Sequence, residues 1–168
     1  MVMSMGLFIN ISDMKYTPNQ HEDKHTTRYY IKNTHKVKSG RSFVICRSGW
    51  EEKFAQWCDI NSSVLYWESE PIAIQYINPI KNRDARYYPD FLLKVKSKNG
   101  NTDTWLVEVK PYRECNPPIK TGKKKKSTLL YEQKSWLINK NKWRAASRLC
   151  KIKGWKFKLI TEKELFGK

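Results

Sequence analysis

The pair Asn99-Gly100 separates two β-rich runs, residues 91–96 and 105–110. Asn-Gly is the dipeptide most typical of a two-residue hairpin turn, because both positions need positive φ and these residues adopt it at low cost. We therefore predict two adjacent antiparallel strands joined by a tight connection. This hairpin determines which residues lie side by side, and it constrains the fold more than any other feature of the sequence.

The second run of the hairpin has two unlike faces. Every second residue from Trp105 to Val109 is apolar, whereas Glu108 and Lys110 alternate with them. Side chains two positions apart share a face of a strand, so the carboxylate and the ammonium group lie on the same side. Asp90 directly precedes the first run, and the hairpin brings it close to both of them.

A helix is predicted to begin just after Ser48. Serine is a favourable N-cap residue, and Glu51 follows three positions later, as in a capping box. Apolar residues then recur at helical spacing as far as about Asn61. Glu51 therefore lies in the first turn of a helix, where it joins Asp90 and Glu108 as a candidate site residue.

The remaining patterns predict a mixed α/β sheet flanked by helices. Further strands are expected at 64–67, 72–76 and 155–160, and a second helix at 128–152, ended by Gly154. The positions of this helix expected to face inward are Leu130, Trp136, Leu137, Trp143, Ala146, Leu149 and Cys150. Residues 1–40 show little periodicity and are expected to form a basic, flexible N-terminal arm before a folded domain at 41–168.

The positive charge is concentrated in the last third of the chain. The 168 residues include 33 Lys and Arg against 16 Asp and Glu, and residues 111–168 alone hold 17 basic and 4 acidic side chains. Such a surplus favours a polyanionic partner, and double-stranded DNA is the partner expected here. The side chains expected to contact its phosphates are Lys123, Lys124, Lys125, Lys126, Lys134, Lys142 and Arg144.

Composition excludes several other classes of protein. With 7 Trp, 9 Tyr and 6 Phe the chain has enough large apolar side chains for a core, which argues against wholesale disorder. Its apolar runs are far shorter than the roughly 18 residues of a membrane span, so no membrane association is expected. No nucleotide cofactor is expected either. The four cysteines form no C-x-x-C pair and are expected to be reduced.

Residues 48–110 differ from the rest of the chain, because they hold 9 acidic and 8 basic side chains. Carboxylates beside a DNA-binding surface repel phosphates unless a cation lies between them. The oxygens of Asp90, Glu108 and Glu51 suit a hard cation such as Mg²⁺, with Mn²⁺ as a substitute. Lys110 would orient or help to deprotonate the water that attacks a phosphodiester, or would stabilise the developing charge.

The same residues carry a resemblance to a known family. Pro89-Asp90, seventeen intervening residues and Glu108-Val109-Lys110 form the PD-(D/E)xK pattern, which resembles the TnsA-like branch of that nuclease superfamily. Longer phrases are similar to the head-completion nucleases of T-even-type tailed bacteriophages, within residues 41–165. These phrases are 47–59, 67–70, 108–111, 139–146 and 154–157.

The resemblance implies a restriction-endonuclease-like core and Mg²⁺-dependent DNA cleavage. It also implies a role in completing the DNA-filled head, capsid or portal components as partners, and a location in the virion and the cytoplasm of the infected host. The helix glutamate of that family directly follows a tryptophan, which corresponds to Glu51, with Glu52 as the alternative.

Other functions remain open at this point. The chain could be a non-catalytic virion protein that binds packaged DNA at the portal, a transposon-end endonuclease subunit, or an enzyme that cuts RNA. The stretch 21–25 matches the zinc-protease pattern H-E-x-x-H, but nothing apolar would pack such a helix, so we interpret the match as accidental. A structural zinc held by Cys115, Cys150 and a histidine has no supporting spacing either.

Overall fold

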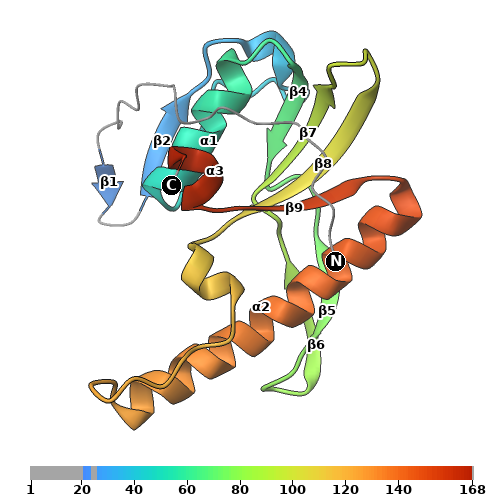
Figure 1. The fold of residues 1–168 in the computed structure, drawn as a ribbon. Helices are drawn as coiled ribbons and strands as arrows, with labels where there is room; N and C mark the ends of the chain where they lie inside the picture. Colours follow the sequence, from blue (N-terminus) through green and yellow to red (C-terminus); the bar gives the residue numbers. More distant parts are fainter. Residues whose placement is uncertain (1–20, 24–25, 168) are drawn as a thin grey trace.

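A four-stranded sheet forms the centre of the computed structural model, which describes residues 21–23 and 26–167 (Figure 1). In sheet order its strands are β4 (Val64–Ser69), β7 (Phe91–Lys96), β8 (Thr102–Val109) and β9 (Lys156–Ile160). The β4–β7 and β7–β8 pairs are antiparallel, and β8 pairs with β9 in parallel. The predicted mixed α/β sheet is confirmed, and it has the form of a restriction-endonuclease-like core.

The predicted hairpin forms between β7 and β8, but its connection is the five residues 97–101 and not a two-residue turn. Of the Asn-Gly pair only the glycine has a positive φ. Lys96 pairs with Thr102 at its end, and Gly100 has φ +86°, a value that glycine adopts without strain. The backbone N–H of Ser97 donates to the carbonyl of Asn101 at 2.7 Å and closes the turn. The turn and the strand pairing agree on one register for the two strands.

Helix α1 (Gly49–Ile60) covers one face of the sheet. Its N-cap is Ser48, whose side chain accepts a hydrogen bond from the backbone N–H of Glu51 at 3.2 Å, as the capping signal predicted. Phe54 and Trp57 are buried and pack with Phe91 of the sheet, where the Phe54 and Phe91 ring centroids lie 5.1 Å apart. This burial fixes the helix, and with it the position of Glu51.

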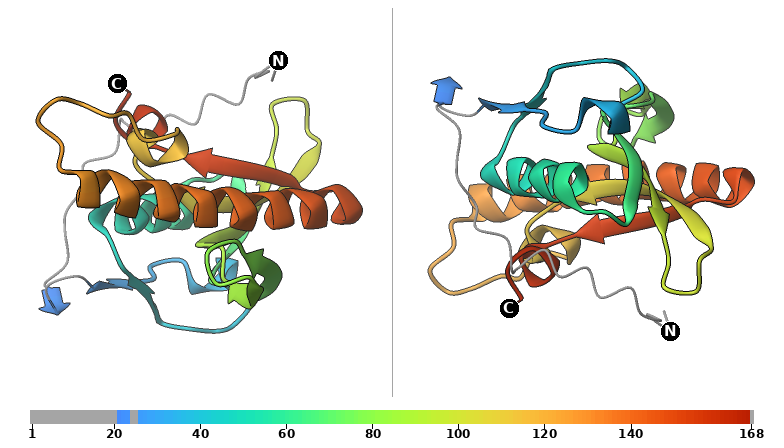
Figure 2. Two further views of the ribbon diagram at one scale, coloured as in Figure 1. Left: turned by 90° about the horizontal axis from the view of Figure 1, so that it is seen from below. Right: turned by 90° about the horizontal axis from the view of Figure 1, so that it is seen from above.

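Helix α2 (Lys126–Lys153) covers the opposite face and ends at Gly154, which has φ +67°. Its buried residues are Trp143, Ala146 and Cys150. The inward positions predicted in its first half are wrong for Leu130 and Leu137, which are 50% and 38% exposed. The helix extends beyond the sheet at that end (Figures 1 and 2). Apolar side chains at helical spacing therefore stay exposed there, because no strand lies opposite them.

The remaining elements frame the central sheet. Strands β5 (Ile74–Asn78) and β6 (Arg83–Tyr87) form a hairpin that packs near α2, and β6 was not predicted. A second sheet contains β1 (His21–Asp23), β2 (Thr26–Tyr30) and β3 (Phe43–Cys46). Three short helices complete the fold: η1 (Thr34–Lys36), η2 (Tyr112–Cys115) and α3 (Glu162–Phe166). None of the helices within the described ranges is long and apolar enough to cross a membrane.

The structure differs from the predicted flexible arm over residues 26–40. Tyr29, Ile31 and Val37 are buried in the same cluster as α1, and β2 pairs with β3. Such short segments lack periodicity of their own and are held by contacts with distant residues, which is why composition alone suggested an arm. The rest of the predicted arm, residues 1–20 and 24–25, lies outside the described residues.

Asp59 at the end of α1 holds this segment to the domain. Its carboxylate accepts hydrogen bonds from the Tyr29 hydroxyl at 2.7 Å and from the backbone N–H groups of Lys32 and Asn33 at 2.7 and 3.0 Å. The side chain is fully buried. Its removal would leave the buried Tyr29 hydroxyl and two part-buried backbone N–H groups without their acceptor.

We therefore expect Asp59→Ala to lower the free energy of unfolding by about 3 kcal/mol, the usual cost of breaking a buried charged network. Urea denaturation followed by circular dichroism measures this change. Asp84→Ala, at an exposed aspartate of β6, serves as the control and should change it by less than about 0.5 kcal/mol. Equal effects of the two substitutions would contradict the assignment.

Candidate active site

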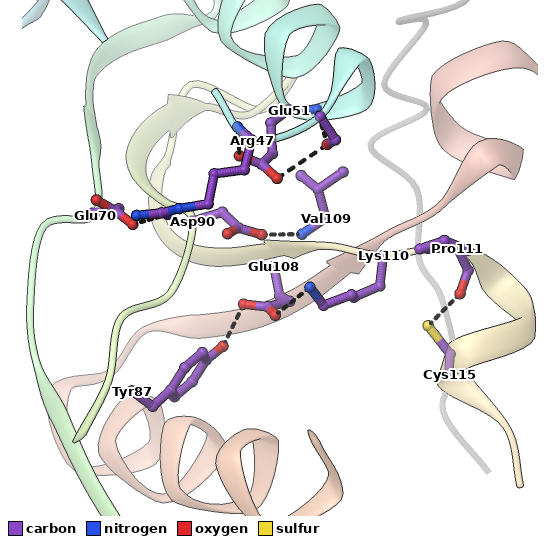
Figure 3. A network of polar contacts seen from close by, with 11 residues as sticks. Arg47, Glu51, Glu70, Tyr87, Asp90, Glu108, Val109, Lys110, Pro111 and Cys115 are labelled. Carbon is purple, nitrogen blue, oxygen red and sulfur yellow. Dashed lines mark hydrogen bonds and ion pairs between the residues drawn. The ribbon is translucent and has the colours of Figure 1, made fainter. Parts of the chain in front are cut away.

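A pocket of about 690 Å³ lies where β7 begins, β8 ends and the N-terminus of α1 meets the sheet. The side chains of Glu51, Asp90, Glu108 and Lys110 all line it, although they come from three different elements and their flanks (Figure 3). The sequence analysis predicted that these four residues converge. The structure brings all of them together.

The sheet register positions Asp90 next to Glu108. Phe91 pairs with Val107, so one step further along the two strands Asp90 faces Glu108. The Oδ2 atom of Asp90 accepts a hydrogen bond from the backbone N–H of Val109 at 2.7 Å, which orients the carboxylate across the strand end. Hairpin geometry therefore creates the pair of carboxylates.

Glu51 is held by the N-terminus of its own helix. Its Oε2 atom accepts from the backbone N–H of Arg47 at 2.8 Å, and its Oε1 atom accepts from the Ser48 hydroxyl at 3.0 Å. Glu52, the alternative left open by the sequence, is buried and does not line the pocket. Of the two glutamates, Glu51 is the one whose position suits a site residue.

Asp90 lies in an environment that disfavours its negative charge. Burial raises its pKa well above the ordinary value, and the charges of Glu108 and Glu51 raise it further. The hydrogen bond from Val109 and the charge of Lys110 oppose this shift without cancelling it. Carboxylates that repel one another in a pocket are a typical arrangement for binding a cation.

Glu108 and Lys110 share the face of β8 that is turned toward α2. The Nζ atom of Lys110 lies 3.5 Å from Oε1 of Glu108, and the Tyr87 hydroxyl donates to Oε2 at 2.7 Å (Figure 3). Glu108 is only 4% exposed, so burial raises its pKa despite these partners. Burial alone would lower the pKa of Lys110, but the charges of Glu108, Asp90 and Glu51 raise it. Lys110 is therefore a charged ammonium group at neutral pH.

Arg47 and Glu70 form an ion pair at the rim of the same pocket (Figure 3). This pair raises the pKa of Arg47, and the charges of Glu51 and Asp90 add to the effect. Glu70 has φ +48°, an uncommon value for a residue other than glycine, and its backbone N–H donates to the carbonyl of Asp90 at 2.9 Å. The turn after β4 is thus connected to the backbone of a site residue.

The donors of the pocket suit a hard divalent cation. They are carboxylate oxygens. Burial and the charges of Glu108 and Glu51 raise the pKa of Asp90, and a bound cation would offset both effects. Among residues 21–23 and 26–167, no group of three or more His, Cys, Asp or Glu side chains is placed to hold a metal ion, so the pocket offers a two-carboxylate site. Mg²⁺ commonly takes one or two carboxylates and completes its shell with water and substrate phosphate, so Asp90 and Glu108 fit that pattern.

The seven predicted DNA-contacting residues lie in three places. Lys123, Lys124 and Lys125 are on the loop before α2, and Lys126, Lys134 and Arg144 are on the exposed surface of α2. Among them, Lys124 pairs with Glu132 at 2.7 Å. The seventh, Lys142, lines the pocket itself.

The two zinc interpretations gain no support from the structure. Residues 21–23 form strand β1 instead of a helix, and His25 lies outside the described residues. Cys115 and Cys150 are free cysteines, and no metal-binding group that includes them is found among residues 21–23 and 26–167.

The sequence did not indicate Tyr87, Arg47 and Glu70 as members of the pocket, and it indicated Lys142 only as one of seven phosphate contacts. Tyr87 reaches Glu108 because β5 and β6 fold back toward α2, and no local pattern gives that packing. The signal that could have drawn attention to Tyr87 is its position three residues before Asp90.

Comparison with known proteins agrees with this geometry. Residues 61–162 match the family model described as TnsA-like endonuclease N terminal. The chain is also 31% identical over 140 residues to the head completion nuclease of Enterobacteria phage T4, a match that covers 80% of this chain and 89% of that protein. The match to the family model includes Asp90, Glu108 and Lys110, and the fold has the mixed sheet expected of such a nuclease. This chain belongs to the TnsA-like endonuclease family.

Proposed function

We propose that this protein is a metal-dependent endodeoxyribonuclease that hydrolyses phosphodiester bonds of DNA and acts in phage head completion after DNA packaging. The observation that carries the proposal is the meeting of Glu51, Asp90, Glu108 and Lys110 in one pocket. Membership of the endonuclease family supports the reaction type, and the name of the T4 relative supports the biological role.

Asp90 and Glu108 would hold the ion, which is Mg²⁺ or, as a substitute, Mn²⁺. Glu51 would assist from the α1 side of the pocket. When bound, the ion supplies charge neutralisation at the phosphoryl oxygens and a lowered pKa for the attacking water. Lys110 contributes a positive charge beside Glu108, where it orients that water and stabilises the charge that develops on the phosphate. Tyr87 keeps one oxygen of Glu108 occupied and so fixes the direction of the other.

The basic residues of the loop and of α2 would bind the phosphates of a DNA duplex. Lys123, Lys125, Lys126, Lys134 and Arg144 are exposed and carry no base-reading pattern. Backbone contacts of this kind give affinity that falls steeply with salt and depends little on sequence. In this proposal capsid or portal components recruit the protein, which acts in the virion and in the cytoplasm of the infected host.

Incubation of supercoiled plasmid with the protein tests the proposal. We expect nicked and linear products with MgCl₂ or MnCl₂ and intact plasmid with EDTA. A structural DNA-binding protein would retard the plasmid in a gel without cutting it under any of these conditions, which would contradict the proposal. A transposon-end endonuclease would instead cut only DNA that carries element ends, with a partner protein present.

Tyr87→Phe should lower the cleavage rate by roughly tenfold, as expected when a hydrogen bond to a metal-holding carboxylate is removed. The ring is kept, so packing near α2 changes little. Single-turnover plasmid cleavage measures the effect, and Tyr30→Phe, at a tyrosine that is 57% exposed, is the matched control. Equal rates for wild type and Tyr87→Phe would show that the hydrogen bond to Glu108 has no part in the reaction.

A further inference from the structure

The pocket contains a second lysine that the PD-(D/E)xK pattern does not include. Lys142 belongs to α2, not to the central sheet, yet it lines the same pocket as Asp90, Glu108 and Lys110. It lies one helical turn before Ala146, which is fully buried against the sheet. The packing of the helix therefore directs residue 142 toward the sheet instead of toward solvent.

Two aromatic rings hold the ammonium group of Lys142 in place. Its Nζ atom lies 5.5 Å from the ring centroid of Tyr87 and 5.9 Å from that of Tyr76. These distances are within the range of a cation–π contact. Tyr87 is also the residue that donates to Glu108, so one tyrosine touches both the carboxylate and the lysine.

The charge of Lys142 is not matched by an ion pair. Over residues 21–23 and 26–167, no carboxylate oxygen comes within 4.0 Å of its Nζ atom, whereas Lys110 has Glu108 at 3.5 Å. Burial lowers the pKa of Lys142, the charges of Glu108 and Asp90 oppose this effect, and the charge of Lys110 adds to it. A partly buried cation without a close anion would be stabilised by an anionic ligand.

We infer that Lys142 is a catalytic residue, which binds a non-bridging oxygen of the scissile phosphate from the α2 side of the pocket. This inference rests on the proposed nuclease function. In this role Lys142 acts as a fixed charge and transfers no proton. The attacking water gives one proton to bulk water and its oxygen bonds to phosphorus. The phosphorus–oxygen bond to the leaving group breaks, and the leaving oxygen keeps the electron pair and takes a proton from bulk water. Lys142 neutralises part of the negative charge that the phosphate gains. Lys110 orients the attacking water, and Lys142 binds the phosphate.

The test compares Lys142→Gln with Lys140→Gln, which removes the same charge from an exposed position two residues away on the same helix. Single-turnover cleavage of plasmid at saturating protein gives the rate of the chemical step, and gel retardation in EDTA gives the affinity for DNA. We expect Lys142→Gln to lower the rate by about 100-fold, as for loss of one charge-stabilising donor, with less than a threefold change in affinity. Lys140→Gln should keep the wild-type rate within about twofold.

A third variant, Lys142→Arg, separates charge from packing. It keeps the cation and should recover at least about a tenth of the wild-type rate, and thermal melting of each variant shows whether the fold is kept. The inference would be overturned if the cleavage rate of Lys142→Gln lay within threefold of the wild-type rate, or if the variant lost only affinity for DNA. Either result would leave the nuclease proposal intact. Wild-type protein that never cuts DNA would reject both.

Discussion

Lys110→Ala abolishes phosphodiester cleavage and leaves DNA binding largely intact: this is the first result that we expect. The ammonium group is the one cation in contact with Glu108 within the described part of the chain, and no other side chain replaces it at that place. Loss of a group that acts on the attacking water costs a nuclease at least about 10³-fold in rate. Affinity is expected to persist because the phosphate contacts come from other basic residues.

Plasmid cleavage under single-turnover conditions measures the rate, and gel retardation in EDTA measures binding. Lys98→Ala is the matched control, because Lys98 is an exposed lysine in the turn at the other end of the same hairpin. The control should cut at the wild-type rate. Cleavage by Lys110→Ala at that rate would remove Lys110 from the site.

Asp90→Asn is expected to abolish cleavage and, in the absence of metal, to make the protein more stable. The pKa of Asp90 is raised in the folded state, so the folded protein binds its proton more tightly than the unfolded chain does. Stability is therefore lost as pH rises from the ordinary aspartate pKa, 3.8, toward the raised value, and the loss persists above it. Asparagine carries no charge and still accepts the hydrogen bond from Val109, so it avoids this loss.

Thermal melting between pH 4 and pH 8 measures the effect. We expect the melting temperature of Asp90→Asn in EDTA to exceed that of wild type by at least about 2 °C at pH 7, with a smaller difference at pH 4. Addition of MgCl₂ or MnCl₂ should raise the melting temperature of wild type and leave that of Asp90→Asn unchanged. Asp84→Asn, at an exposed aspartate, should behave as wild type in both respects, and an identical metal response in Asp90→Asn would contradict the proposed ion site.

Local signals predicted the parts of the fold that depend on a few neighbouring residues. Ser48 caps α1 with its side chain, a role that few residue types fill. Gly100 in the hairpin turn and Gly154 at the end of α2 have positive φ, which favours glycine. The hairpin then carries Asp90 and Glu108 to the same place, which is why the convergence of the candidate site could be predicted. Their chemical roles remain predictions.

Contacts between distant residues escaped the sequence analysis. Residues 26–40 join the domain through the hydrogen bond of Tyr29 with Asp59, thirty positions apart. Leu130 stays exposed because the sheet ends before the helix does, and helical spacing cannot show where a facing strand stops. Lys142 belongs to the pocket for a similar reason, since its position depends on how α2 packs against β5 and β9.

The most direct measurement is a crystal of the full chain soaked in MnCl₂, with anomalous scattering used to locate the ion. The account predicts one strong anomalous peak between the carboxylates of Asp90 and Glu108, within coordination distance of both, and loss of that peak in Asp90→Asn. A peak at another site, or none between these two carboxylates at a concentration that supports cleavage, would contradict it.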